Sequence, residues 1–164
     1  MKNVVITGGA GFIGSHLANA LIRKSQRVIV IDNLSTGNKA NLHKKALFKK
    51  IDIRDFGALK QAMKGVDYVF HLAALPRIQR SIHNPLETNE VNIQGALNVL
   101  EAARLNGVKR VIFTSSSSVY GNQKCLPHTE NMIPDPLSPY ALQKYIGEKY
   151  CQMYTDLYGL ETLS

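Results

Sequence analysis

The sequence predicts a doubly wound α/β domain, in which helices cover both faces of a parallel sheet. Short apolar segments alternate along the chain with longer amphipathic segments, as strands alternate with crossover helices. The second apolar segment, VIVI, is hydrophobic at every position, which is typical of a strand buried on both faces. A glycine-rich turn, GGAGFIG, directly follows the first apolar segment, where such folds turn from strand to helix.

Each element follows from this alternation. Strands are expected where apolar and β-branched residues cluster, at 3–7, 27–31, 46–51, 68–72 and 110–114. Amphipathic patterns predict helices at 12–24, 55–64 and 88–106, with a helical turn near 40–44. Ser138 and Pro139 begin a further helix as its cap and first residue, and Gly159 ends it after residue 158.

The last residues, 160–164, have the pattern of a sixth strand that has only begun. Domain boundaries more often fall in polar linkers. We therefore expect residues 1–164 to be one domain at the amino-terminal end of a longer protein.

Composition excludes several classes of protein. Hydrophobic residues make up 45% and charged residues 20% of the chain, the values of a soluble globular domain. No apolar run approaches the roughly 18 residues of a membrane span, so no membrane association is expected. Cys125 and Cys151 are too few and too far apart for a metal site or a disulfide framework. A reducing cytoplasm is the expected setting.

The net charge of +8 is concentrated around the third predicted strand, in Lys39, Lys44, Lys45, Lys49 and Lys50. Such a cluster is most often a solvated face, and it would also attract an anionic nucleotide. A nucleic-acid surface would be expected to interleave aromatic side chains or arginines, and only Phe48 is present. Nucleic acid is therefore not the expected partner.

The glycines at 8, 11 and 14 form a G-x-x-G-x-x-G turn between a strand and a helix. Glycine allows the backbone to turn and lets a phosphate approach its amides. The helix that follows presents free N–H groups and the positive end of its dipole to an anion. The pattern predicts a dinucleotide site, and the alternative is a tight turn with glycines for packing alone.

Asp32 ends the second strand, 18 residues after Gly14. This is close to the offset of about 20 residues for an acid that binds the adenosine ribose. A carboxylate there would repel a 2′-phosphate, and no arginine follows within 32–38, so NAD is favoured over NADP. The alternative is a turn residue. Asp52, after the third strand, is placed either to contact adenine or to begin a turn.

Tyr140 and Lys144 lie four residues apart at the start of the last helix and therefore share a face. A free phenol has a pKa near 10, and lowering it by about three units takes roughly 4 kcal/mol. A lysine ammonium and a positively charged nicotinamide could supply this in a partly dry site. Amphipathic packing is the alternative. The serines of FTSSSSVYG, at the end of the fifth strand, favour a catalytic site instead.

Together, TGGAGFIGSH, Asp32, HLAA (71–74), VNIQG around Asn92, SSSSVYG and SPYALQK resemble the extended short-chain dehydrogenase/reductase family over essentially the whole chain. The branch they resemble is that of the nucleotide-sugar 4-epimerases, which include UDP-glucose and UDP-N-acetylglucosamine 4-epimerases. The resemblance implies a Rossmann-type fold and NAD as cofactor. It also implies a UDP-sugar substrate, a homodimer, and a second, substrate-binding domain that this chain does not contain.

The resemblance assigns roles to individual residues. Tyr140 is the expected catalytic base, Lys144 its partner, and Ser116 the hydroxyl that bridges tyrosine and sugar. A 4-hydroxyl proton would pass to Tyr140 as hydride leaves for NAD, and the resulting 4-keto sugar would receive the hydride back on its other face. Cofactor contacts are expected at Gly8, Gly11, Phe12, Ile13, Gly14, Asp32, Asn33, Ser35, Thr36, Gly37, Asp52, Ile53, Leu72, Ala73, Ala74, Asn92, Tyr140 and Lys144.

Substrate contacts are expected at Pro76, Arg77, Ser116, Ser117 and Ser118, and Arg80 belongs to the same segment that resembles the family's sugar-facing loop. Related sugar dehydratases carry an acidic pair directly after the bridging hydroxyl, whereas here these positions are Ser117 and Ser118, which argues against dehydration. The alternatives left open are another reaction on a nucleotide-sugar, by a reductase, decarboxylase or dehydratase, and a non-catalytic NAD-binding module.

Overall fold

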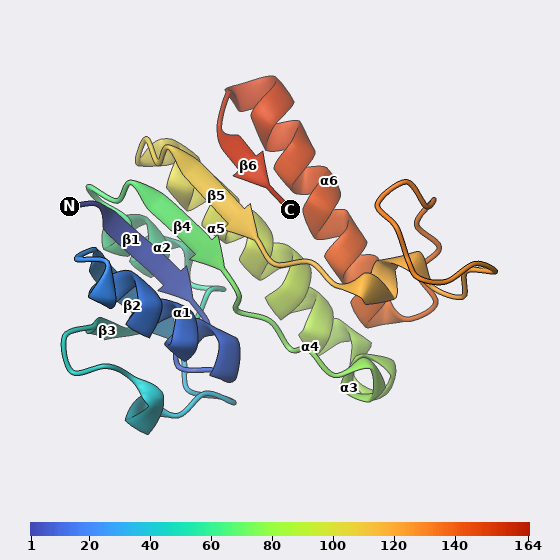
Figure 1. The fold of residues 1–164 in the computed structure, drawn as a ribbon, viewed down its shortest axis with the longest axis horizontal. Helices are drawn as coiled ribbons and strands as arrows, with labels where there is room; N and C mark the ends of the chain where they lie inside the picture. The colour runs from blue at the N-terminus through green and yellow to red at the C-terminus, as the bar shows by residue number, and fades with distance from the viewer.

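The computed structural model describes all 164 residues, which form one six-stranded parallel sheet with helices on both faces (Figure 1). The strand order is β3-β2-β1-β4-β5-β6, and every neighbouring pair is parallel. The order reverses between β1 and β4, which makes the gap between them the switch point where such folds bind ligands. The predicted fold class is confirmed. The strands are β1 (Asn3–Thr7), β2 (Arg27–Asp32), β3 (Leu47–Lys50), β4 (Tyr68–His71), β5 (Arg110–Phe113) and β6 (Glu161–Leu163).

Six α-helices and three shorter turns connect the strands. The helices are α1 (Phe12–Arg23), α2 (Phe56–Ala62), α3 (Ile78–His83), α4 (Pro85–Asn89), α5 (Gly95–Leu105) and α6 (Pro139–Tyr158). Two 3-10 turns lie at η1 (Lys39–Asn41) and η3 (Ser117–Tyr120), and a π-helical turn, η2 (Glu90–Gln94), joins α4 to α5.

Alternate residues of the central strands enter two separate cores. On one face, α1 covers Val4, Ile6, Val28 and Val30. On the other, α2, α5 and α6 enclose a larger core, which includes Val5 and the corresponding residues of β2, β4 and β5. Figure 1 shows α1 in front of the sheet and α2 and α5 behind it. Burial on both faces is the reason that VIVI contains no polar residue.

The predicted helix 88–106 is wrong in its start and its regularity. The helical segment begins at Pro85, passes through the π-helical turn and continues as α5. Thr88 and Asn92 on this segment are polar but buried, and they form hydrogen bonds with Gln143 of α6 and with the Leu75 backbone, respectively. Because buried polar residues do not appear in an apolar pattern, the first turns of the helical segment were not predicted. The helix α3 was not predicted, because six residues are too few for a helical period to be visible.

The predicted ends of α6 are confirmed by cap geometry. The Ser138 hydroxyl accepts a hydrogen bond from the backbone N–H of Ala141, and Pro139 occupies the first turn. At the other end Gly159 has φ = +68°, the left-handed conformation that ends helices. The cap and the stop thus fix the span of α6, whose first turns carry Tyr140 and Lys144.

The lysine cluster lies at the edge of the sheet, and all of its side chains are exposed. Lys49 and Lys50 belong to the edge strand β3, where charges discourage pairing with another sheet. The Lys39 Nζ lies 5.6 Å from the centre of the Phe48 ring, so the one aromatic side chain near this cluster already contacts a lysine of the protein. None of the helices combines the length and hydropathy needed to cross a bilayer.

Candidate functional site

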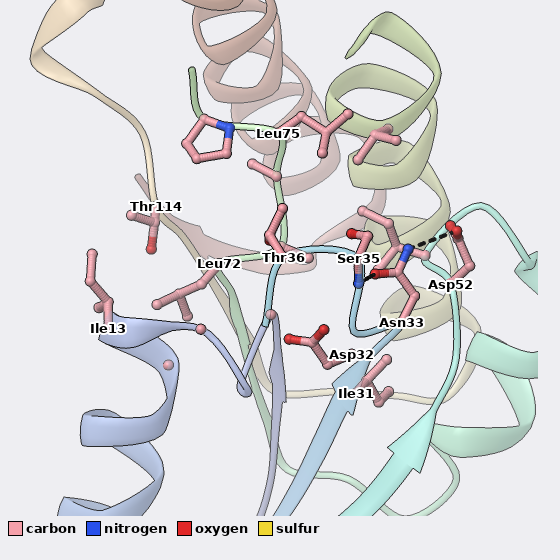
Figure 2. Close-up of a pocket in the computed structure, with 18 of the residues that line it drawn as sticks. Ile13, Ile31, Asp32, Asn33, Ser35, Thr36, Asp52, Leu72, Leu75 and Thr114 are labelled. Carbon is pink, nitrogen blue, oxygen red and sulfur yellow. Dashed lines mark hydrogen bonds between the residues drawn. The ribbon is translucent and has the colours of Figure 1, made fainter. Parts of the chain in front are cut away.

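A cavity of about 450 Å³ lies at the carboxyl ends of the strands, beside the switch point. Loops after β1 to β5 and the start of α6 form its wall. Figure 2 shows Ile13 and Leu72 on one side and Asp32, Asn33 and Asp52 on the other. Many predicted residues lie on this wall: Gly8, Gly11, Phe12, Ile13, Gly14, Asp32, Asn33, Ser35, Thr36, Asp52, Ile53, Leu72, Ala73, Ala74, Pro76, Tyr140 and Lys144.

The three glycines of the turn differ in what requires them. Gly8 has φ = +70°, and a Cβ added there would lie 2.7 Å from the Ala73 backbone nitrogen. A Cβ on Gly14 would lie 2.4 Å from the Gly8 carbonyl oxygen. A Cβ on Gly11 meets only that oxygen, at 3.3 Å. Packing therefore explains Gly8 and Gly14, whereas Gly11 keeps space open on the cavity side.

The first turn of α1 is suited to an anion. Its N-cap, Gly11, supplies no side-chain oxygen, and the turn contains no acidic residue. The first N–H groups of a helix have no partner within it, and the helix dipole adds positive potential there. The residues present thus fit the pyrophosphate of a dinucleotide.

The Asp32 carboxylate is 8% exposed and oriented by two backbone groups. Its Oδ2 accepts from the Ala10 N–H at 3.0 Å, and its Oδ1 accepts from the Leu34 N–H at 2.8 Å. A carboxylate oxygen can accept two hydrogen bonds, so each oxygen keeps one acceptor position. Two neighbouring hydroxyls of a ribose match these two positions.

Lys144 is 5% exposed and lies on the cavity wall. Its Nζ donates to the Thr114 carbonyl oxygen at 2.7 Å and lies 4.9 Å from the centre of the Phe113 ring. Burial lowers the pKa of this ammonium to about 8. The side chain is therefore held at the end of β5, and it is charged at neutral pH.

Tyr140 stands one helical turn before Lys144, and only 8% of it is exposed. Its backbone N–H donates to the Ser81 hydroxyl at 3.0 Å, which ties the start of α6 to α3. Burial raises the pKa of the phenol, and a hydrogen bond with Ser116 acts in the opposite direction. The expectation that Lys144 lowers this pKa is not met by the protein side chains alone, because the ammonium points to Thr114.

Ser116 is the N-cap residue of η3 and does not line the cavity. After β5, Thr114 and Ser115 form the cavity wall instead. The Ser116 hydroxyl accepts from the Ser118 hydroxyl at 2.8 Å, and its link to the cavity is the contact with the Tyr140 phenol. Ser117 and Ser118 do not line the cavity either. Neither does Arg77, the N-cap residue of α3.

Two predicted cofactor contacts support the wall without being part of it. Asn92 exchanges two hydrogen bonds with the Leu75 backbone, at 2.8 and 3.2 Å, and so braces the loop after β4. It also donates to Gln143 of α6 at 2.8 Å. Gly37 packs closely against Ala10, where an added Cβ would lie 2.9 Å from the alanine Cβ.

Several wall residues were missed. Three of them, Ile51, Thr114 and Ser115, follow strands directly, and the rule that parallel sheets bind ligands at the carboxyl ends could have found them. Glu87, in the part of α4 that was not predicted, pairs at 2.8 Å with Arg80, which lies on the wall as expected for the sugar-facing segment. The missed residues are Ile31, Ile51, Arg54, Leu75, Glu87, Val91, Thr114 and Ser115.

The buried Lys144 predicts a pH dependence of stability. Its pKa is about 8 in the folded chain and near 10.4 when unfolded, so the unfolded chain binds more protons between these values. The free energy of unfolding should therefore rise as the pH increases from about 8 to 10, by up to about 3 kcal/mol. Thermal denaturation of the wild type and Lys144→Met measures this difference. A parallel pH profile for the two proteins would contradict it.

The sequence profile of the NAD-dependent epimerase/dehydratase family matches residues 4–164. The chain belongs to this family. NAD is the family's cofactor, in agreement with the glycine turn and Asp32.

Individual relatives agree with this assignment. A putative UDP-glucose 4-epimerase of Methanocaldococcus jannaschii is 44% identical over 96% of the chain and 52% of its own length. The crystal structure of Thermotoga maritima UDP-glucose 4-epimerase with UDP-glucose superimposes with a TM-score of 0.95 at 41% identity, covering 98% of this chain and 53% of that one. A UDP-N-acetylglucosamine 4-epimerase of Methanobrevibacter ruminantium superimposes at 0.93 and 44% identity, with the same coverage. The chain thus spans about half the length of these relatives.

Proposed function

We propose that residues 1–164 form the NAD-binding half of a nucleotide-sugar 4-epimerase that acts on UDP-glucose or UDP-N-acetylglucosamine. The observation that carries the proposal is that Tyr140 and Lys144 line the same cavity as the glycine turn and Asp32, from which they are separated by more than 100 residues. Similarity to UDP-glucose and UDP-N-acetylglucosamine 4-epimerases supports the substrate class.

In the proposed mechanism, Tyr140 moves a proton at the 4-hydroxyl of the sugar. NAD, which the glycine turn and Asp32 would hold, would supply a hydride acceptor and donor at C4 of the sugar. The Tyr140 phenolate takes the hydroxyl proton, with Ser116 steadying the phenol, and returns it once the 4-keto sugar has turned over. Lys144, one turn along α6 on the same cavity wall, would supply a positive charge to stabilise the phenolate and a donor for the nicotinamide ribose.

Burial makes the phenolate costly, because a charged group loses hydration in the cavity. The base therefore needs cationic neighbours to ionise, and Lys144 is the ammonium nearest to it along the helix. The serines at 117 and 118 carry no carboxylate and lie off the wall, so they supply no acid for elimination of water. This favours epimerisation over dehydration.

Asp32 should make the cavity selective for NAD over NADP. A 2′-phosphate would meet a buried carboxylate, and we expect NAD to bind at least about 100-fold more tightly. Asp32→Ala should weaken NAD binding by about tenfold or more and reduce this preference, because both the acceptors and the repulsion are removed. Calorimetric titration with the two dinucleotides tests this. An unchanged ratio of the two affinities would show that Asp32 does not contact the ribose.

The function itself is tested by assay of UDP-glucose and UDP-N-acetylglucosamine with the product sugars resolved. Since the chain spans about half of its relatives, the assay uses both the chain and a chimera. In the chimera, residues 1–164 replace the matching half of the Methanocaldococcus jannaschii relative. We expect the chimera to interconvert the 4-epimers without net release of reduced NAD. A net change in reduced NAD during turnover would point to a reductase or decarboxylase instead.

We also propose a homodimer formed through α5 and α6. Apolar side chains at helical spacing are exposed along α6, and Leu105 is 43% exposed on α5. Light scattering of the purified protein measures the assembly. The exposed apolar residues of α6 are Leu142, Met153, Leu157 and Tyr158.

The unpaired cysteines support a reducing cytoplasm as the compartment.

A further inference from the structure

The Asp52 carboxylate, at the far end of the cavity, accepts four hydrogen bonds. Arg54 donates three of them: its backbone N–H and its Nε to Oδ1, at 2.9 and 3.0 Å, and its Nη2 to Oδ2 at 2.8 Å. The Asn33 side-chain amide donates the fourth, to Oδ2 at 3.0 Å (Figure 2). Two carboxylate oxygens offer about four acceptor positions, so all of them are in use.

Asp52 differs in this respect from Asp32, whose carboxylate keeps two acceptor positions for a ligand. A ligand that donates to Asp52 must replace one of the existing donors. The Arg54 fork is bidentate and held by charge, whereas Asn33 gives a single neutral hydrogen bond. Asn33 also lies on the cavity wall, with its Oδ1 accepting from the Ser35 N–H at 2.9 Å. The Asn33 amide is therefore the donor that a ligand can displace.

Arg54 is itself held in place from α5 and η2. The Asn98 side-chain amide, on α5, donates to the carbonyl oxygens of Ile53 and Arg54, both at 3.1 Å. The Arg54 Nη1 reaches Glu90 at 3.3 Å. The Arg54 guanidinium holds the pKa of the Asp52 carboxyl well below its usual range. The carboxylate consequently has a defined orientation and acts only as an acceptor.

We propose that Arg54 is a positioning residue for base selection, which holds Asp52 so that the cavity accepts adenine through its exocyclic amine in place of the Asn33 amide. The inference rests on the proposed binding of NAD in this cavity. Adenine carries an amine donor at C6, whereas hypoxanthine carries a carbonyl oxygen there, which an oriented carboxylate repels. Without Arg54 the carboxylate would be free to turn away, and the two bases would bind alike.

The test is a titration of the chain with NAD and with nicotinamide hypoxanthine dinucleotide. The wild type should bind NAD at least about tenfold more tightly, the worth of one hydrogen bond to a charged group. In Arg54→Leu, NAD affinity should fall by about tenfold or more while that for the hypoxanthine analogue changes less than about threefold. General damage to the fold would weaken both dinucleotides equally. The ratio of affinities is thus the readout.

The matched control is Arg104→Leu. Arg104 makes the same bidentate contact with a carboxylate, that of Glu101 at 2.9 and 2.7 Å, but outside the cavity. The Arg104→Leu variant should leave the ratio of the affinities for NAD and the hypoxanthine analogue unchanged. If Arg54→Leu does not fold, Arg54→Lys keeps the charge without the fork and should lower the ratio.

Three results would overturn the inference: an unchanged ratio in Arg54→Leu, a full ratio in Arg54→Lys, or a wild type that binds both dinucleotides equally. A wild type that binds neither would instead overturn the proposed function, on which the inference depends.

Discussion

Replacing Tyr140 with phenylalanine is expected to lower epimerase turnover by about 10²- to 10⁴-fold, the usual worth of a positioned acid or base. The change removes the phenol oxygen and keeps the ring, which is 8% exposed and part of the packed start of α6. The backbone N–H would still donate to Ser81. NAD affinity should therefore change less than about threefold, and folding should be intact. Assays of the chimera measure turnover, and titration of the chain measures NAD binding.

Tyr154→Phe is the control on the same helix. The Tyr154 hydroxyl donates to Glu101 at 3.1 Å and is absent from the cavity wall. Its removal should cost about 1 kcal/mol of stability or less and leave turnover unchanged. If the Tyr140→Phe chimera epimerises its substrate at the parent rate, Tyr140 is not the base.

Alanine substitutions at Gly14 and Gly11 of the turn are expected to have large but different effects, the first on stability and the second on NAD binding. Gly14→Ala should lower the free energy of unfolding by about 3 kcal/mol or more, because the new Cβ would lie 2.4 Å from a backbone oxygen that cannot move alone. Gly11→Ala should cost only about 1 kcal/mol, since its single close neighbour is at 3.3 Å. It should nevertheless weaken NAD binding at least about tenfold, because the methyl group occupies the approach of the pyrophosphate.

Denaturant unfolding and NAD titration measure the two effects separately. Gly57→Ala, in α2, serves as the control, because the nearest atom to its new Cβ would be 3.6 Å away. It should stabilise the chain by about 0.5–1 kcal/mol and leave NAD binding unchanged. Normal NAD affinity in Gly11→Ala would show that this glycine serves only the turn.

The order of strands and helices could be predicted because each depends on a local pattern. Strand residues such as 28–31 are apolar throughout, and α6 has a cap and a stop at its ends. The failures lie where elements are short or polar. The six-residue α3 has no visible period, and Asn92 is buried on its segment because it bonds to the loop after β4.

The types and spacing of the residues were enough to predict which side chains meet in one cavity. Gly11, Asp32, Tyr140 and Lys144 were each predicted from a short motif, and all of them line one cavity. They meet because the carboxyl ends of parallel strands share one edge of the sheet.

The chemical state of these groups depends on contacts that form only in the folded chain. The tertiary structure raises the pKa of the Tyr140 phenol, directs Lys144 to the Thr114 carbonyl, and uses every acceptor position of Asp52. Burial and hydrogen bonds between distant segments set these properties, and no local pattern contains them. Local sequence patterns thus identify the side chains that are candidates for the proposed chemistry, whereas packing sets which of their atoms remain available to a ligand.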